Sequence, residues 1–275
     1  MNYFPEIIKY LSNTEHVTEI YLAPKAFIIE KRGKELIKVA NVVLNPEDIK
    51  ETLNAMRNQS SFALGPLGRE GIFSLGIQNV GRLRVRYITQ RGSYMVHILR
   101  VPYQIPPFEK LCPNAGLSAT LESLLKDSTP GVINFHGKNY AAVSTFIYSL
   151  LQHISVKYSK VIYVLENPLT FLLRHGWSII IQREVGADIE TFEEGLKDAI
   201  YIDPHIVYVG YRETIPNSEI NRLLHILETK SLILLNAPVG EEDVLEEFKG
   251  SVSASIRLNE EGFPMLNLES KKPQV

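Results

Sequence analysis

The stretch GVINFHGKNYAAVST, residues 131–145, constrains the fold more than any other part of this chain. A phosphate-binding loop reads G-x-x-x-x-G-K-[ST] and joins a buried strand to a helix. Apolar residues before Gly137 predict the strand, and an apolar run after Thr145 predicts the helix. The frame of such a loop is therefore present, but Ala142 stands at its second glycine position and Val143 at its lysine position.

The loop keeps Gly137 at the first-glycine position and Ser144 and Thr145 at the Ser/Thr positions, and Tyr140 adds a bulky ring inside it. A normal loop binds phosphate through backbone N–H groups and through the charge of its lysine. A charge-assisted contact contributes about 1.5–3 kcal/mol, so losing the lysine alone predicts a loss of affinity of more than about tenfold. Lys138 is the nearest substitute, and we expect it to be an exposed loop residue.

Composition sets limits on the class of protein. The 275 residues include 45% apolar and 22% charged residues, as in ordinary globular proteins. The net charge of −2 predicts no attraction of the whole molecule to nucleic acid. The single cysteine, Cys112, excludes an internal disulfide framework and a cysteine-rich metal site, and we expect it to be buried. We see no signal peptide and no integral membrane segment, so we expect a cytoplasmic protein.

The first part of the chain predicts a compact α+β domain over residues 1–101. Apolar residues at helical spacing predict helices at 2–11 and at 45–56. Strand-like runs occur at 19–22, 27–30, 36–43, 72–77, 83–88 and 94–101. The proline-rich run VPYQIPPF then predicts an extended linker, which we place at 102–112.

The remainder predicts an α/β core over residues 113–270, followed by a tail at 271–275. Strands are expected at 131–136, 160–165, 178–182, 206–210 and 231–236, and helices at 118–126, 143–155, 190–201 and 217–228. The strands are apolar almost throughout, as buried parallel strands require. Two final runs, 252–258 and 263–268, predict a closing hairpin.

Several motifs in this order resemble one family. They are GRLRVRYITQRGSYMVHILR, the altered loop, VLENPLTF, IIQREVGADIETFEEGLKDAI, YIDPHIVYVGYRET and SLILLN. The set resembles the type II/IV secretion-system ATPase superfamily, above all the PilT-like retraction ATPases of type IV pili and twitching motility, with GspE-like ATPases as relatives. The most specific piece is 182–186 with the helix that leads to Asp203-Pro204.

The resemblance implies a PAS-like N-terminal domain and a RecA-like core with the P-loop NTPase fold. It implies ring hexamers that bind ATP between the two domains. In the family, hydrolysis is coupled to adding or extracting pilin at an inner-membrane platform protein.

This chain departs from the family at its acidic box and at the strand that carries the catalytic glutamate. The family has Glu-Asp-Pro where this chain has Glu166-Asn167-Pro168, so one carboxylate is missing. The family's Val-Gly-Glu ends in Tyr211 here. A tyrosine with a pKa near 10 is no general base at neutral pH. Glu213, two residues further, is the alternative base.

Two further departures concern histidines. The family's Leu-His-Thr is replaced by 236–238, Asn-Ala-Pro, so the sensor histidine is absent. His205 stands where the family has the second aspartate of Asp-Pro-Asp, and we expect it at the surface or the sheet edge. The following helical part is shortened to the charged run 241–250 and the hairpin.

The family's basic residues on the PAS-like strands match Arg84, Arg91 and Arg100. In the family such residues reach the phosphates or a neighbouring subunit. A guanidinium also binds carboxylates, so these arginines fit an interface as well as a nucleotide. Together with the arginines, the remnant nucleotide site consists of Gly137, Lys138, Ser144, Thr145 and Glu166.

We therefore expect a pseudo-ATPase with no catalytic residue, degenerate at Val143, Asn167 and Tyr211. It would act as a structural or regulatory component of a type IV pilus or type II secretion motor, with an active homologous ATPase or the inner-membrane platform protein as partner. We expect no cofactor and no metal. ATP with Mg²⁺ would bind only if the remnant site is functional. One alternative is a residual ATPase that uses Lys138 and Glu213. Another is a sensor that binds a ligand in the inter-domain cleft near Tyr140 and Tyr211.

Overall fold

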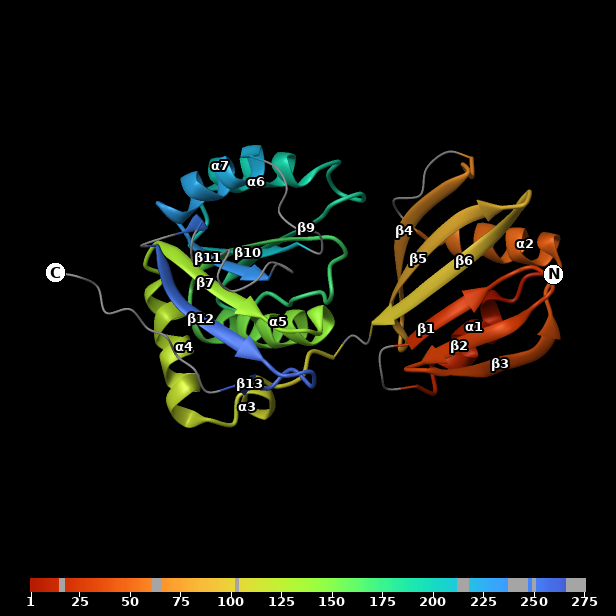
Figure 1. Cartoon of the computed structure of the whole chain (residues 1–275), viewed down its shortest axis with the longest axis horizontal. Helices are drawn as coiled ribbons and strands as arrows, with labels where there is room; N and C mark the ends of the chain where they lie inside the picture. The colour runs from red at the N-terminus through yellow and green to blue at the C-terminus, as the bar shows by residue number, and fades with distance from the viewer. Residues whose placement is uncertain are drawn as a thin grey trace. The chain divides into compact units, whose positions relative to one another are not determined.

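The computed structural model describes residues 1–14, 18–60, 66–101, 104–211, 218–236, 247–248 and 251–265. The chain divides into two compact units, Met1–Gln104 and Ile105–Val275. Each unit has its own β-sheet and its own helices (Figure 1). Within the described ranges, no helix has the length and apolar character needed to cross a lipid bilayer.

The first unit is a six-stranded antiparallel sheet with the strand order β3-β2-β1-β6-β5-β4. Helices α1 and α2 lie on one side of it (Figure 1). The strands are β1 (Thr18–Leu22), β2 (Phe27–Arg32), β3 (Glu35–Val43), β4 (Glu70–Ile77), β5 (Gly81–Gln90) and β6 (Ser93–Val101), and the helices are α1 (Phe4–Leu11) and α2 (Pro46–Arg57).

Alternation along the strands sets the core of this unit. On β5, Leu83 and Val85 are fully buried, while Arg84 between them faces the other side of the sheet. Helix α2 begins where Asn45 and Asp48 form a capping box just before and inside its first turn. These local signals are strong, so the helices and strands expected in this unit are confirmed.

The second unit is a seven-stranded sheet with the order β13-β12-β7-β11-β10-β8-β9. Its strands are β7 (Gly131–His136), β8 (Val161–Glu166), β9 (Ile179–Glu184), β10 (Ile206–Gly210), β11 (Leu232–Asn236), β12 (Val252–Leu258) and β13 (Pro264–Met265). All pairs are parallel except the hairpin of β12 and β13. The expected closing hairpin is thus confirmed.

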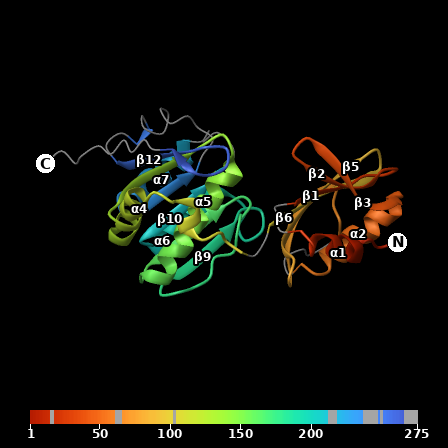
Figure 2. The same cartoon turned by 90° about the horizontal axis from the view of Figure 1, so that it is seen from below.

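Helices cover both faces of this sheet. Helix α5 (Tyr140–Lys157) lies on one face, and α6 (Phe192–Ile202) and α7 (Ser218–Glu228) lie on the other (Figures 1 and 2). Helix α4 (Ala115–Asp127) packs beside α5. This is the layered α/β architecture that near-continuous apolar strands predict.

Several boundaries differ from expectation by two or three residues, and two differences concern the neighbourhood of α5. Helix α5 begins at Tyr140, three residues before the expected start, because the side chain of Asn139 caps it by accepting from the N–H of Ala142. A short helix, α3 (Phe108–Leu111), lies inside the expected linker. It forms there because Phe108 is buried, with its ring 5.6 Å from that of Phe146 on α5.

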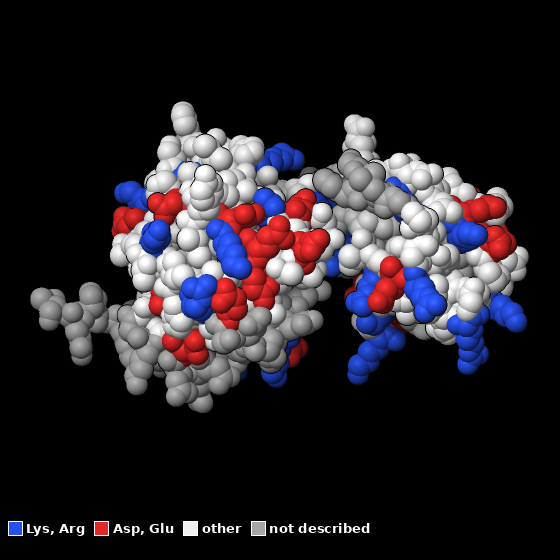
Figure 3. Space-filling view, turned by 90° about the horizontal axis from the view of Figure 1, so that it is seen from above, with Lys and Arg blue, Asp and Glu red and all other residues white. Residues whose placement is uncertain are grey.

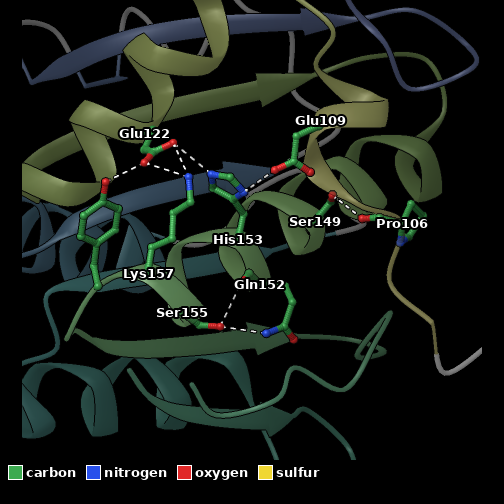
Figure 4. A network of polar contacts seen from close by, with 9 residues as sticks. Pro106, Glu109, Glu122, Ser149, Gln152, His153, Ser155 and Lys157 are labelled. Carbon is green, nitrogen blue, oxygen red and sulfur yellow. Dashed lines mark hydrogen bonds and ion pairs between the residues drawn. The ribbon is translucent and has the colours of Figure 1, made fainter. Parts of the chain in front are cut away.

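A polar network fixes α3 and α4 on α5 (Figure 4). The two ring nitrogens of His153 lie 3.1 Å from a carboxylate oxygen of Glu109 and 3.0 Å from one of Glu122. Glu122 also accepts from Lys157 and Tyr158. The hydrogen bond with His153 is the largest cause that lowers the pKa of Glu122 to about 2.

The carboxyl ends of three parallel strands meet at one edge. Gly210 at the end of β10 pairs with Glu166 on one side and with Asn236 on the other. The expected run 241–250 lies mostly outside the described residues, as do the tail, Glu213 and positions 237 and 238. The PAS-like label for the first unit remains a prediction.

Candidate functional site

The altered loop forms the junction between β7 and α5. Ala142, Val143 and Ser144 lie in the first turns of α5 rather than in an open loop. The side chain of Val143, at the lysine position, is fully buried. A Cβ atom on Gly137 would lie 2.8 Å from the carbonyl oxygen of Leu258 on β12, so this position requires glycine. The helix start is therefore packed against its neighbours.

Glu166 is the centre of the site. It ends β8, and its side chain is fully buried beside the first turns of α5. Its Oε1 atom accepts hydrogen bonds from the hydroxyls of Ser144 (2.7 Å), Tyr140 (2.9 Å), Tyr208 (2.9 Å) and Thr170 (3.1 Å). Its Oε2 atom accepts from the Tyr148 hydroxyl (2.9 Å) and the backbone N–H of Thr170 (2.7 Å). We call these residues the Glu166 cluster: Tyr140, Ser144, Tyr148, Glu166, Thr170 and Tyr208.

The surroundings of the cluster keep the phenols of Tyr148 and Tyr208 protonated. Burial raises the pKa of Tyr148 and of Tyr208 well above the usual value, and the nearby Glu166 charge raises both further. Both phenols therefore remain donors at neutral pH. A carboxylate that accepts several hydrogen bonds can remain buried without a cation, because each donor offsets part of the lost hydration.

The cluster is tightly packed around Gly210. A Cβ atom there would lie 2.6 Å from Cγ of Glu166 and 2.6 Å from the hydroxyl oxygen of Tyr140. Asn236, at the end of β11, is also buried and points its amide nitrogen at the Tyr208 hydroxyl, 3.5 Å away. The side chains from three strand ends and α5 thus fill this corner themselves.

The residues at the degenerate positions lie around this corner. Tyr211 follows Gly210, and its ring packs edge-on against Phe192 at 4.5 Å. Its backbone N–H donates to the carbonyl of Asn236 at 2.9 Å. Asn167 follows Glu166 and is half-buried. Tyr211 therefore packs against the start of α6.

Other predicted site residues lie apart from the cluster. The Lys138 side chain is 80% exposed, and its Nζ lies 3.9 Å from Oε1 of Glu260. Thr145 donates its hydroxyl to the carbonyl of Ala141 within α5. His205 accepts from the backbone N–H of Val161, at the opposite end of β8 from Glu166.

The three arginines of the first unit do not converge on one point. Arg100 is buried, and its Nε donates to the carbonyl of Val80 at 2.7 Å, while burial lowers its pKa. Arg84 faces the opposite side of the sheet, since it pairs with Leu99 and not with Arg100. Arg91 lies in the turn between β5 and β6 with a φ of 51°.

Sequence reasoning singled out Ser144, Glu166 and Tyr140 but missed Tyr148, Thr170 and Tyr208. The overlooked residues carry hydroxyls on otherwise apolar segments that approach one edge of the sheet. The strand HIVYVG holds the clearest signal, because a tyrosine is the only side-chain hydroxyl in a strand that is otherwise apolar after its histidine.

Comparisons with known proteins agree on one group. The chain is 26% identical to the type IV pilus ATPase PilU of Pseudomonas aeruginosa over 180 residues, which are 66% of this chain and 46% of that protein. It is 26% identical to the type IV pilus retraction ATPase PilT of the same organism over 139 residues, 50% of this chain and 39% of that protein. The chain spans about half of the length of the curated relatives it matches. No family model matches it.

The fold agrees with a solved structure. The crystal structure of the pilus retraction motor PilT with bound ADP matches with a TM-score of 0.75 at 21% identity. The match covers 100% of this chain and 84% of that one. The expected architecture of an α+β N-terminal domain followed by a parallel-sheet α/β core is confirmed.

Proposed function

Since the chain belongs to the type II/IV secretion ATPase superfamily and is PilT-like, we propose that it is a catalytically inactive member that serves as a structural or regulatory component of a type IV pilus or type II secretion motor. The observation that carries this proposal is the Glu166 cluster. It lies where the first turns of α5 meet Glu166 of the acidic box. Hydroxyl groups of the chain itself donate hydrogen bonds to that carboxylate.

The hydrogen bonds within the Glu166 cluster argue against Mg²⁺ binding at this site. The Ser144 hydroxyl stands at the Ser/Thr position of the loop, where a phosphate-binding loop uses it to hold Mg²⁺. Here Ser144 lies 2.7 Å from the Glu166 carboxylate and 2.8 Å from the Thr170 hydroxyl, and all three side chains are buried. A Mg²⁺ ion requires octahedral oxygen ligands near 2.1 Å, so it would have to separate these groups.

Phosphate binding is opposed by the first turns of α5. The side chain of Val143 is buried in the core, so no positive charge is present at the position where a phosphate-binding loop has its lysine. The Tyr140 ring reaches over to Glu166, and its hydroxyl lies close to Gly210. An added triphosphate would approach the buried carboxylate with like charge. Both effects act against ATP.

Catalysis lacks a base for the attacking water. Tyr211 packs against Phe192, and a phenol is protonated at neutral pH. The lysine that binds phosphate and the base that activates water are both replaced, so neither group is left to make up for the loss of the other.

Nucleotide binding tests the first half of the proposal. A fluorescent ATP analogue is titrated with the purified chain, with and without Mg²⁺, beside a homologous ATPase that keeps the loop lysine and the catalytic glutamate. We expect no saturable binding to this chain up to millimolar analogue, and micromolar binding to the homologue. Micromolar, Mg²⁺-dependent binding to this chain, or turnover above that of a buffer blank, would overturn the proposal.

Partner binding tests the second half. We propose that the chain joins a homo- or hetero-oligomeric ring, or contacts the inner-membrane platform protein, on the cytoplasmic side. The test mixes the chain with the active homologous ATPase and measures molar mass by light scattering together with the ATPase rate. We expect a mixed assembly with a changed rate. A chain that remains separate from both the ATPase and the platform protein would contradict a role in the motor.

A further inference from the structure

A second surface of the core unit lies at the opposite end of the sheet from the Glu166 cluster. It contains three exposed apolar side chains: Val156 (50% exposed), Trp177 (75%) and Ile179 (59%). Ile179 begins β9 and pairs with Val161, whereas Glu166 ends β8 five residues later. Five residues of strand span about 17 Å, so the two places are separate. We call this surface the Trp177 face.

The Trp177 face is built from two segments that are bonded together. The backbone N–H of Ser178 donates to the carbonyl of Ser155 at 3.1 Å, and that of Ile179 donates to the carbonyl of Lys160 at 2.8 Å. A Cβ atom on Gly176 would lie 2.7 Å from Cα of Val156, so these backbones are in contact. Trp177 is therefore presented to solvent on a fixed platform.

The other end of the platform is fixed as well. Gln152 on α5 accepts from the backbone N–H of Arg174 at 2.8 Å, and its amide donates to the carbonyl of Arg174. Figure 4 shows Gln152 and Ser155 on one side of α5, away from His153 and Lys157. Because these hydrogen bonds already hold the segment 174–179 in place, binding of a partner to Trp177 requires little further loss of conformational entropy in this segment.

Charge distinguishes this face from the rest of the unit. Between residues 131 and 182 the only acidic residue is Glu166, and it is fully buried. The same stretch supplies the cations Lys160 and Arg174 around the Trp177 face, whereas Lys157 is paired with Glu122 on the other side of α5. Carboxylates gather instead over another side of the unit, as Figure 3 shows, and the sequence of α6 and the residues just before it is rich in acidic residues.

We propose that the Trp177 face binds the surface of an anionic lipid bilayer. Tryptophan is enriched where proteins meet the headgroup region, since its ring is apolar and its N–H can remain hydrated. Val156 and Ile179 add apolar area beside it, and the cations are attracted to acidic headgroups. The net charge of −2 gives the whole molecule no such attraction, so binding depends on the presentation of this face.

The chain provides its own probe for the test. Trp177 is the only tryptophan, so the intrinsic emission above 300 nm at selective excitation reports on this face alone. The full chain is mixed with vesicles of phosphatidylglycerol and phosphatidylcholine, and separately with pure phosphatidylcholine, without nucleotide. We expect a blue shift, quenching by brominated lipid and co-sedimentation with the anionic vesicles only, all weakened by salt.

Variants locate the binding surface. Trp177→Ala with Ile179→Ser should abolish co-sedimentation, and both residues are exposed, so folding is retained. Arg174→Gln and Lys160→Gln should each reduce the partition coefficient by about fivefold. The matched controls are Leu36→Ser, which removes an apolar side chain that is 70% exposed on β3 of the first unit, and Lys138→Gln, which removes an exposed cation. Neither control should change binding.

Three results would overturn the proposal. The first is no blue shift and no co-sedimentation with anionic vesicles at millimolar lipid. The second is equal loss of binding in the controls and in the Trp177-face variants. The third is a blue shift that appears without lipid when the concentration of this chain is raised or the homologous ATPase is added. That result would assign the face to a protein partner. Because the assay contains no nucleotide, its outcome is independent of the proposed inactivity.

Discussion

Replacement of Glu166 by alanine separates a structural carboxylate from a catalytic one. In the structure this carboxylate accepts from five side-chain hydroxyls and one backbone N–H, and its side chain is fully buried. Glu166→Ala leaves the hydroxyls of Ser144, Tyr148 and Tyr208 without this acceptor in a region closed to water. If the cluster exists to hold the fold together, its centre should be costly to remove.

The magnitude follows from those donors. An unsatisfied buried polar group costs about 1–3 kcal/mol, so three of them set a range of about 3–9 kcal/mol. Two effects reduce this cost. Ser144 can re-pair with Thr170 or Tyr208, which lie 2.8 and 3.1 Å away, and removing a buried charge recovers its desolvation cost. We expect a net loss of about 3–5 kcal/mol in the free energy of unfolding.

Urea unfolding followed by circular dichroism measures this loss, with thermal melting as a second readout. For a unit of this size, about 3 °C per kcal/mol corresponds to a drop in Tm of roughly 10–15 °C. Glu190→Ala, just before α6, is the matched control, because that carboxylate is exposed and its removal should change stability by less than about 0.5 kcal/mol. A loss below about 1 kcal/mol for Glu166→Ala, or a gain, would refute the structural role, since catalytic groups are often removed without loss of stability.

Three other perturbations have defined outcomes. Gly210→Ala places a Cβ atom 2.6 Å from Cγ of Glu166 and should cost about 1–3 kcal/mol in urea unfolding. Tyr208→Phe removes one donor to the carboxylate and should cost about 1–2 kcal/mol, without changing the circular dichroism spectrum. For His225, the hydrogen bond with Glu228 is the largest cause that raises its pKa above 6.5. Its contribution to stability is therefore full below pH 6.5 and is lost as the pH rises through the folded pKa, which a series of melting curves from pH 5.5 to 8.5 records.

Each of these has its own control. Gly92→Ala lies in a turn with open space around the added Cβ, so it should show backbone strain at a φ of 77° but no clash. Tyr201→Phe alters an exposed phenol and should be neutral. His225→Gln should flatten the pH dependence of the melting temperature between pH 6.5 and 8.5. An unchanged slope in that variant would show that another group titrates.

The frame of the site could be predicted from the sequence. The apolar run before Gly137 and the run after Thr145 indicated a strand and a helix, and β7 and α5 are there. Motif spacing placed Val143 at the lysine position, and the family resemblance placed Tyr211 at the position of the base; both assignments stay predictions. The strand and the helix were predicted correctly because local periodicity and a fixed motif spacing need no knowledge of distant contacts.

The chemistry inside the frame could not be predicted in the same way. Tyr148 is eighteen residues from Glu166 and Tyr208 is forty-two, yet both donate to the same carboxylate. The start of α5 at Tyr140 and the short helix at Phe108 also depend on partners outside the local sequence. Arg84 and Arg100 looked alike in sequence, but the pleat of the sheet directs them to opposite faces.

Composition, periodicity and motif spacing by themselves determined a two-part α/β chain with the frame of a phosphate-binding loop, in which Ala142 and Val143 stand at the glycine and lysine positions. The tertiary structure decided what replaces them. It brought the ends of β8, β10 and β11 to the first turns of α5, so that hydroxyls from separate segments surround one buried carboxylate. It also set Trp177 on a hydrogen-bonded platform at the other end of the sheet. A sequence specifies each strand and helix locally, but only the register of parallel strands decides which distant side chains share a place.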